Sequence, residues 1–187
     1  MHPESGPVTL IAKRLQEHLG DPPPTAIVLG SGLGVVVDRL EIEARVSSDA
    51  IGLPPSTVPG HAGVLLKGTL DGSPVLLMSG RVHLYEGYPV QEVIRYVRAF
   101  HAWGIQRLIL TCSAGGIDRG LEPGDLLVIT DHINFMQNQA LVGPSWGPDR
   151  FPDMTEAYDP YIRSKLLEAG EALGQELHEG VYAASTG

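Results

Sequence analysis

The stretch Val-Leu-Leu-Met-Ser-Gly-Arg-Val-His-Leu-Tyr-Glu-Gly-Tyr, residues 75–88, joins a strand-like apolar run to a cluster of polar side chains. After a glycine, a guanidinium, an imidazole, a phenol and a carboxylate follow at Arg81, His83, Tyr85 and Glu86. In an extended segment alternate residues point the same way, so Arg81, His83 and Tyr85 are expected to share one face. The planar fork of an arginine suits two oxygens of a phosphate or carboxylate. The stretch therefore predicts a strand whose carboxyl end opens onto a site for a small anionic or sugar-bearing ligand.

A purely structural role is the alternative interpretation of the same residues. An Arg and a His after an apolar strand also serve to solvate the strand end or to pair with nearby carboxylates, and such ion pairs are common. The other segments of the sequence favour the ligand site.

The length and charge of the chain restrict its class. A chain of 187 residues is long enough for one domain with a sizeable core, so a single α/β domain over residues 1–187 is expected. Its 13 basic and 22 acidic residues give a net charge of −9, which argues against a broad basic surface for nucleic acid. A local anion pocket needs only a few fixed donors and stays compatible with this charge.

Cysteine content and hydropathy indicate a cytoplasmic enzyme or binding protein. Cys112 is the only cysteine, so neither an internal disulfide nor a cysteine-rich metal site is expected. The first residues carry neither a cationic segment nor an apolar run typical of a signal peptide. No apolar stretch approaches the roughly 20 residues that a membrane helix needs, so no membrane partner is expected.

Helical and strand-like patterns alternate along the chain. Helices are expected at residues 8–19, 34–40, 89–104 and 161–173. Strands are expected at residues 26–29, 63–70, 74–79, 107–111, 125–130 and 180–185. Asp71-Gly72 predicts a hairpin between two of these strands, and residues 134–158 predict a long functional loop.

This order predicts an α/β fold with a mixed, largely buried β-sheet flanked by helices. Ligands of such folds lie at the carboxyl ends of the strands. Glycine-rich or polar segments follow three of the predicted strands, at residues 30–34, 80–87 and 112–116. We therefore expect these segments to converge on one site.

The glycine turn at residues 30–34 can present backbone N–H groups and the Ser31 hydroxyl to an anion at a helix N-terminus. A plain tight turn and a nicotinamide-cofactor site are the alternatives. The dinucleotide fingerprint requires a last glycine where Val35 stands, and Asp49, near the position of its ribose carboxylate, has no clear preceding strand. A P-loop is also excluded, because no Gly-Lys-Ser/Thr follows the turn.

Other chemistries are less well supported by the residues. His61 lies in a predicted turn and is either solvated or part of the site, and with His83 it lacks a clear third ligand for a metal. The surroundings of Ser31 do not have the spacing of a hydrolase nucleophile elbow. Cys112 could be a nucleophile, but a thiol at a buried strand end is more often a small core residue.

Taken together, these segments resemble the trimeric type of purine nucleoside phosphorylase, within the nucleoside phosphorylase superfamily. The resemblance runs in family order through Leu29-Gly-Ser-Gly-Leu-Gly34, Ser56-Thr-Val-Pro-Gly-His-Ala-Gly63, Gly80-Arg-x-His-x-Tyr-Glu-Gly-Tyr-Pro89, Ala114-Gly-Gly116, Gly124-Asp125, Asp131-His-Ile-Asn134 and Asp149-Arg-Phe-Pro152. The third of these strings is highly specific, whereas the glycine turn alone is a weak signal.

The resemblance implies phosphorolysis of purine (deoxy)ribonucleosides, with 6-oxopurines preferred, to the free base and (deoxy)ribose 1-phosphate. It implies an enzyme of purine salvage, a pentosyltransferase that uses phosphate as co-substrate and needs no metal or organic cofactor, and that forms a homotrimer. The implied phosphate-binding residues are Ser31, His61, Arg81, His83 and Ser113. The implied sugar-binding residues are Tyr85, Cys112 and, from a neighbouring subunit, Phe151. His83 and Glu86 are the implied catalytic residues, with Glu86 orienting the phosphate and nearby hydroxyls.

The sequence departs from the family pattern in two places. Cys112 stands where members commonly carry asparagine, and Ser113 where they carry alanine, which is expected to change sugar or phosphate affinity while keeping the backbone donor. The chain also stops at Gly187, before the family's base-recognising segment, so a C-terminally incomplete, N-terminal portion is expected. The alternative function is then a catalytically inactive phosphate-binding or assembly fragment.

Overall fold

The computed structural model describes residues 2–55 and 63–185. The contacts of the chain divide it into two compact units, Met1–Ser113 and Ala114–Gly187, and each unit is described by itself. Whether the chain forms the single domain expected from its length stays a prediction.

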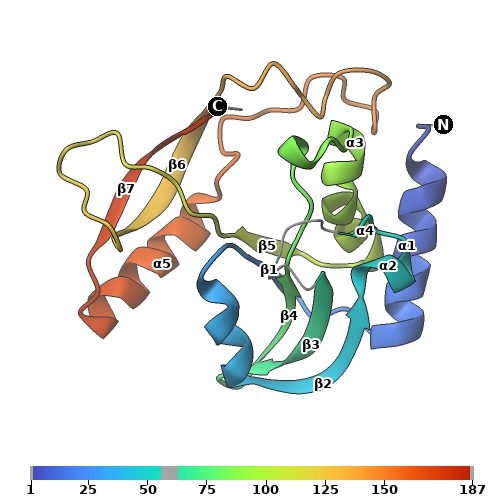
Figure 1. Ribbon diagram of the computed structural model, residues 1–187, viewed down its shortest axis with the longest axis horizontal. Helices are drawn as coiled ribbons and strands as arrows, with labels where there is room; N and C mark the ends of the chain where they lie inside the picture. Colours follow the sequence, from blue (N-terminus) through green and yellow to red (C-terminus); the bar gives the residue numbers. More distant parts are fainter. Residues whose placement is uncertain (1, 56–62, 186–187) are drawn as a thin grey trace. The chain divides into compact units, whose positions relative to one another are not determined.

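The first unit is built on a five-stranded sheet in the order β2-β3-β4-β1-β5 (Figure 1). Strand β1 pairs in parallel with β4 and with β5, whereas β3 is antiparallel to both β2 and β4. The strands are β1 (Thr25–Leu29), β2 (Leu40–Ser47), β3 (Val64–Leu70), β4 (Ser73–Ser79) and β5 (Arg107–Leu110). The predicted α/β class with a mixed sheet flanked by helices is therefore confirmed.

The β3–β4 hairpin forms at the predicted Asp71-Gly72 turn. Asp71 and Gly72 have φ values of 47° and 80°, as a two-residue turn of the mirror-image type requires, and Leu70 pairs with Ser73 across it. This turn fixes the register that leaves Ser79 at the far end of β4, at the entrance to the polar cluster.

The main core lies between one face of this sheet and the helices α1 (Ser5–Leu19), α2 (Ser48–Ile51) and α4 (Arg95–Trp103). Alternation along β1 sends Ala26 and Val28 into this core, while Leu29 belongs to a smaller apolar cluster on the other face. Helix α1 ends at the predicted Gly20, which caps its last turn with φ 71°. Each fully buried aliphatic or aromatic side chain contributes roughly 1.5–3 kcal/mol through its removal from water.

The ordinary helix that was expected at residues 34–40 is a 3-10 helix. The segment Leu33–Arg39 is a 3-10 helix, η1, that buries none of its residues. Three consecutive valines, Val35 to Val37, follow a glycine-rich turn, and β-branched side chains disfavour a longer α-helix.

Strand β2, directly after η1, was not predicted. Its residues alternate apolar and polar from Leu40 to Ser47, which is the ordinary strand pattern. An irregularity between Ile42 and Ala44 breaks the register against β3, and Ile42 is exposed.

The predicted helix over residues 89–104 is broken into α3 (Val90–Val93) and α4, with Ile94 between them. Of the residues expected to face inward, Phe100 is buried, whereas Val93, Ile94 and Val97 are only partly buried. The other buried residues of α4 are Tyr96, Ala99 and Trp103. Both the start at Pro89 and the end at Gly104 agree with the prediction.

Strand β5 was expected to be buried, and it is not. It lies at the edge of the sheet, where only β1 pairs with it, and Leu110 is 59% exposed. Periodicity shows that a segment is apolar but not whether its strand takes a central or an edge position.

The second unit contains β6 (Leu126–Asn134), β7 (Leu177–Ala184) and α5 (Pro160–Leu173). The two strands pair in parallel as a two-stranded sheet (Figure 1). Asp159 caps α5 by accepting the Ile162 N–H at 2.9 Å, and the buried Gly170 lets Leu177 of β7 pack closely against the helix.

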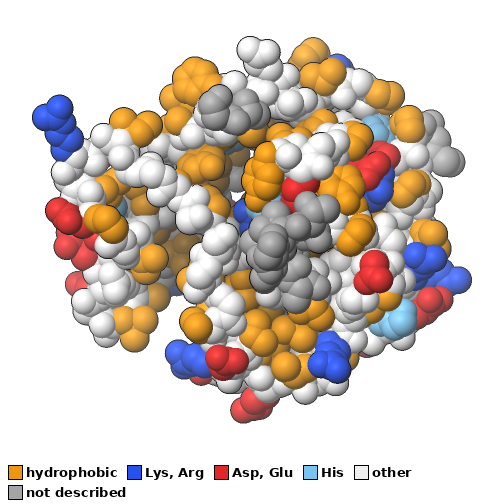
Figure 2. Space-filling model, viewed as in Figure 1, with side chains coloured by type: hydrophobic (Ala, Val, Ile, Leu, Met, Phe, Trp, Pro, Cys, Tyr) orange, Lys and Arg blue, Asp and Glu red, His pale blue; other side chains and the backbone are white. Residues whose placement is uncertain are grey.

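The residues between β6 and α5 contain neither helix nor strand, which confirms the loop predicted at residues 134–158. In the part of the chain that the structure describes, no helix is both long enough and apolar enough to span a membrane. Figure 2 shows the Lys and Arg side chains of the visible face scattered among apolar, acidic and uncharged groups.

Candidate functional site

The carboxyl ends of β4, β1 and β5 lie at the same edge of the first unit's sheet. Leu29 pairs with Ser79, and Val28 pairs with Leu110, so all three parallel strands end within one register step of each other. The chain therefore leaves the sheet here at Gly30, Gly80 and Thr111. The predicted convergence of segments 30–34, 80–87 and 112–116 begins at these three positions.

Hydrogen bonds of Gly30 and Thr111 join the end of β1 to the end of β5. The Gly30 N–H donates to the Thr111 hydroxyl at 2.7 Å, and that hydroxyl donates to the Val28 carbonyl at 2.9 Å. A Cβ atom at Gly30 would lie 2.7 Å from the Thr111 carbonyl oxygen and 2.9 Å from the Cα of Cys112. The close approach of two backbones is therefore the reason that glycine is needed here.

The glycine turn presents Ser31 to solvent. Gly32 takes φ 87°, a left-handed conformation, and η1 begins at the next residue. Ser31 is exposed, so its hydroxyl is accessible to a ligand at the strand ends.

Arg81, which follows β4, contacts the end of β5. One of its terminal guanidinium nitrogens lies 3.5 Å from the Thr111 carbonyl oxygen, a long hydrogen bond to the end of β5. The side chain is half-buried and forms no ion pair with any described residue. The simple alternative, an arginine neutralised by a nearby carboxylate, is therefore not what residues 2–55 and 63–185 show. A half-buried cation without a carboxylate partner is suited to an anionic ligand.

The residues after Arg81 do not stay extended, as the sequence had suggested. The backbone is extended at His83, and a 3-10 turn, η2 (Leu84–Glu86), then follows. Tyr85 consequently does not alternate with His83, and its ring stacks on the imidazole with centroids 4.7 Å apart and planes at 13°. Tyr85 is exposed, so the outer face of this stack is a flat surface of the kind that packs against a sugar or base.

Glu86 folds back onto His83. Its carboxylate accepts the backbone N–H of His83 at 2.7 Å and lies 3.1 Å from the imidazole Nδ1. The Glu86 side chain is only 2% exposed, against 24% for His83. Glu86 therefore fixes the backbone and the ring of His83, and its assignment to the phosphate and nearby hydroxyls stays a prediction.

Replacing Glu86 with alanine is expected to destabilise this turn. The partly buried His83 N–H would lose its acceptor, so we expect the free energy of unfolding to fall by about 1–3 kcal/mol. Denaturant titration of Glu86→Ala measures this, with Glu86→Gln, which keeps an acceptor oxygen, as the milder control. Equal midpoints for the alanine variant and the unmodified chain would contradict the contact.

Cys112 and Ser113, which follow β5, are both exposed. The expectation that Cys112 is a small core residue was therefore wrong, because β5 is an edge strand and its end is open to solvent. Ser113 lies in no helix or strand among the described residues, and the donor role of its N–H stays a prediction.

The remaining predicted residues lie elsewhere. His61 lies outside the described residues. Phe151 belongs to the loop of the second unit, is 89% exposed, and has the Arg150 guanidinium 6.0 Å from its ring centroid. No group of three His, Cys, Asp or Glu that could hold a metal ion occurs among the residues described.

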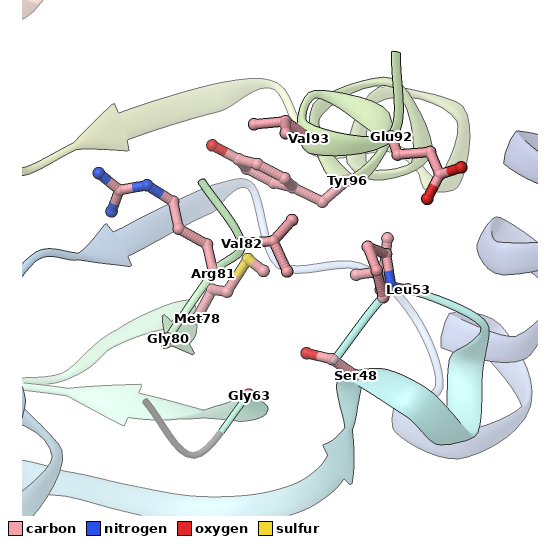
Figure 3. A pocket seen from close by; sticks show the side chains of 11 residues that line it. Ser48, Leu53, Gly63, Met78, Gly80, Arg81, Val82, Glu92, Val93 and Tyr96 are labelled. Carbon is pink, nitrogen blue, oxygen red and sulfur yellow. The ribbon is translucent and has the colours of Figure 1, made fainter. Parts of the chain in front are cut away.

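A small pocket adjoins Arg81 and contains two residues that the sequence analysis missed. It is lined mainly by apolar groups, together with Gly80, Arg81, Glu92, Ser48 and Tyr96 (Figure 3). Burial raises the pKa of the Tyr96 phenol, and the nearby Arg81 charge partly opposes that rise. Tyr96 could have been found as an aromatic residue four positions before Phe100 on one helix, whereas no sequence pattern marks Ser48.

The Ser48 hydroxyl is buried, points into this pocket, and has no hydrogen-bond partner among the described residues (Figure 3). Burying an unpaired hydroxyl is unfavourable. We therefore expect Ser48→Ala to raise the free energy of unfolding by about 1 kcal/mol. A thermal or denaturant midpoint measures the change, and a loss of stability would mean that the hydroxyl has a partner.

Comparison with known proteins agrees with this geometry. A family model described as the phosphorylase superfamily matches residues 24–187. A curated relative, purine nucleoside phosphorylase 1 of Geobacillus stearothermophilus, is 44% identical over 179 residues, which cover 94% of this chain and 65% of the relative. The chain thus spans slightly less than two thirds of that relative's length.

Two solved structures are similar as well. A purine nucleoside phosphorylase in complex with ribose 1-phosphate has a TM-score of 0.86 and 35% identity, covering 94% of this chain and 68% of that one. A Schistosoma purine nucleoside phosphorylase in complex with hypoxanthine has a TM-score of 0.89 and 34% identity, covering 98% of this chain and 67% of that one. Because the family model matches residues 24–187, the chain belongs to the phosphorylase superfamily.

Proposed function

We propose that this chain carries the phosphate site of a purine nucleoside phosphorylase. The observation that supports this most strongly is the meeting of Gly30, Arg81 and Thr111 at three adjacent strand ends, with the guanidinium not paired to any described carboxylate. The relatives at 34–44% identity carry the same name.

In the proposed reaction an oxygen of inorganic phosphate attacks the anomeric carbon of a purine (deoxy)ribonucleoside. The bond from that carbon to the purine nitrogen breaks, and its electron pair leaves with the base, which takes up a proton. The products are the free purine and a pentose 1-phosphate. The protein's part is to remove phosphate from water and aim it at a carbon that becomes cationic, which fixed donors achieve without a covalent intermediate.

The described residues divide naturally between the two substrates. Ser31, Arg81, His83 and the Ser113 N–H are proposed to hold phosphate, because these groups are donors at or next to the strand ends. Tyr85 and Cys112 are proposed to face the sugar; the stacked Tyr85 and His83 rings supply a flat surface for it.

Finer features of the proposal follow the family resemblance. We propose a cytoplasmic homotrimer in purine salvage that prefers 6-oxopurines. Phe151 is proposed to reach a neighbouring subunit's site, and its almost complete exposure on the long loop supports that role.

The experiment is a phosphate-dependence assay of the purified protein with inosine. Hypoxanthine and ribose 1-phosphate should form only when phosphate is present. Release of hypoxanthine with free ribose in the absence of phosphate would contradict phosphorolysis. Saturable phosphate binding without turnover would instead support the alternative of a phosphate-binding or assembly fragment.

A further inference from the structure

Tyr96 is held rigidly in the core beneath the strand ends. It is 8% exposed, lies on α4, and packs edge-on against Phe100 with ring centroids 5.6 Å apart and planes at 70°. Both rings belong to the main apolar core that α1 and the sheet enclose. The direction of the phenol oxygen is therefore set by core packing rather than by solvent.

That oxygen lies on the same side of the pocket as the guanidinium of Arg81. Figure 3 shows the Tyr96 ring extending from α4 with its hydroxyl toward the Arg81 side chain, and both residues line the one pocket. None of the described residues forms a hydrogen bond with this hydroxyl. A phenol is neutral near neutral pH, and its oxygen keeps lone pairs that can accept an N–H of the guanidinium.

A second hydrogen bond would fix the orientation of the Arg81 guanidinium better than its bond to the Thr111 carbonyl does alone. Its contact to the Thr111 carbonyl is long, at 3.5 Å, and a guanidinium held at a single point can rotate away from the strand ends. A guanidinium has five N–H donors, so two supports still leave donors for an anion. Binding sites gain affinity when the groups behind the contacting residue fix its rotamer.

We propose that Tyr96 is a positioning residue for Arg81: when the guanidinium turns to bind phosphate, the phenol oxygen accepts one of its N–H groups, and the remaining donors are aimed at the anion. This role rests on the proposed function, because it presupposes that Arg81 binds phosphate. Tyr96 itself does not touch the anion.

The test is a double-mutant cycle on the intact chain, with phosphate binding followed by phosphorus NMR. Tyr96→Phe removes only the hydroxyl and keeps the ring in the core. We expect it to weaken phosphate binding about three- to tenfold, the effect of one hydrogen bond, and to leave the melting temperature unchanged. In an Arg81→Ala background the same change should have no effect on affinity, since there is no guanidinium to position. Tyr161→Phe, at an exposed phenol on α5, is the matched control and should bind phosphate normally.

The other possible outcomes overturn either the role of Tyr96 or the phosphate site itself. Normal affinity of Tyr96→Phe together with a weakened Arg81→Ala would overturn the role of Tyr96 and leave the proposed function intact. An equal loss in both backgrounds would also overturn it, because Tyr96 would then act without Arg81. Normal phosphate binding by Arg81→Ala would instead overturn the phosphate site itself.

Discussion

Replacing Arg81 with alanine is expected to weaken phosphate binding about 30-fold or more, which corresponds to roughly 2 kcal/mol for one charge-assisted fork in a partly desolvated site. The reason is the position of this side chain. It is the cation at the three strand ends, it contacts the end of β5, and no described carboxylate neutralises it. Equilibrium dialysis or calorimetry with inorganic phosphate measures the loss, and in an active enzyme the Michaelis constant for phosphate should rise in parallel.

Arg107 supplies the matched control. It lies at the opposite end of β5, where its guanidinium Nε donates to the Thr25 hydroxyl at 3.1 Å. Arg107→Ala removes the same charge from the same unit and should leave phosphate affinity nearly unchanged. Arg81→Lys should bind with intermediate affinity, because an ammonium keeps the charge and loses the fork. Equal affinities for Arg81→Ala and the unmodified chain would show that the site has been assigned wrongly.

The second large effect is expected at Gly30. A Cβ atom there would lie 2.7 Å and 2.9 Å from backbone atoms of Thr111 and Cys112, which cannot move aside as a flexible side chain would. Gly30→Ala should therefore force the ends of β1 and β5 apart. We expect a loss of about 1–3 kcal/mol in the free energy of unfolding, as for other overpacked positions, together with weaker phosphate binding.

Gly34, in the same glycine-rich turn, provides the control for Gly30. A Cβ at Gly34 would meet no atom within 4 Å, so Gly34→Ala should fold and bind normally. Denaturant midpoints of the two variants separate steric crowding from a general requirement for glycine. If Gly30→Ala matched Gly34→Ala in both stability and phosphate affinity, the close packing of the two strand ends would be refuted.

The sequence predicted those parts of the fold that depend on local chemistry. Asp71-Gly72 can hardly be accommodated other than in a tight turn, and Gly20 and Gly104 end helices by adopting positive φ. The convergence of the strand ends was also predictable, because it follows from three parallel strands each ending in a glycine-rich or polar segment.

What the sequence did not predict depends on contacts between distant residues. Whether β5 is central or at an edge depends on which strands pair with it, and its own four residues do not contain that information. The turn after His83 forms because Glu86 accepts the His83 backbone N–H, a local bond that competes with the extended pattern. Strand β2 is an exception, because its own alternation of apolar and polar residues is sufficient to predict a strand.

The candidate site likewise contains residues that the sequence predicted and one that it did not. Arg81, His83 and Ser31 were identified because their residue types suit an anion. Tyr96 was missed because a buried aromatic on a helix ordinarily indicates only core packing. Its relation to Arg81 appears once α4 is placed beside the end of β4 in space.

Titration of the isotope-labelled protein with inorganic phosphate, followed through its backbone amide NMR signals, tests the convergence of the strand ends most directly. The account predicts that signals from Ser31, Arg81 and Ser113 shift together and give one common dissociation constant. Shifts confined to a single segment, different constants for the three segments, or no shifts at all would contradict it.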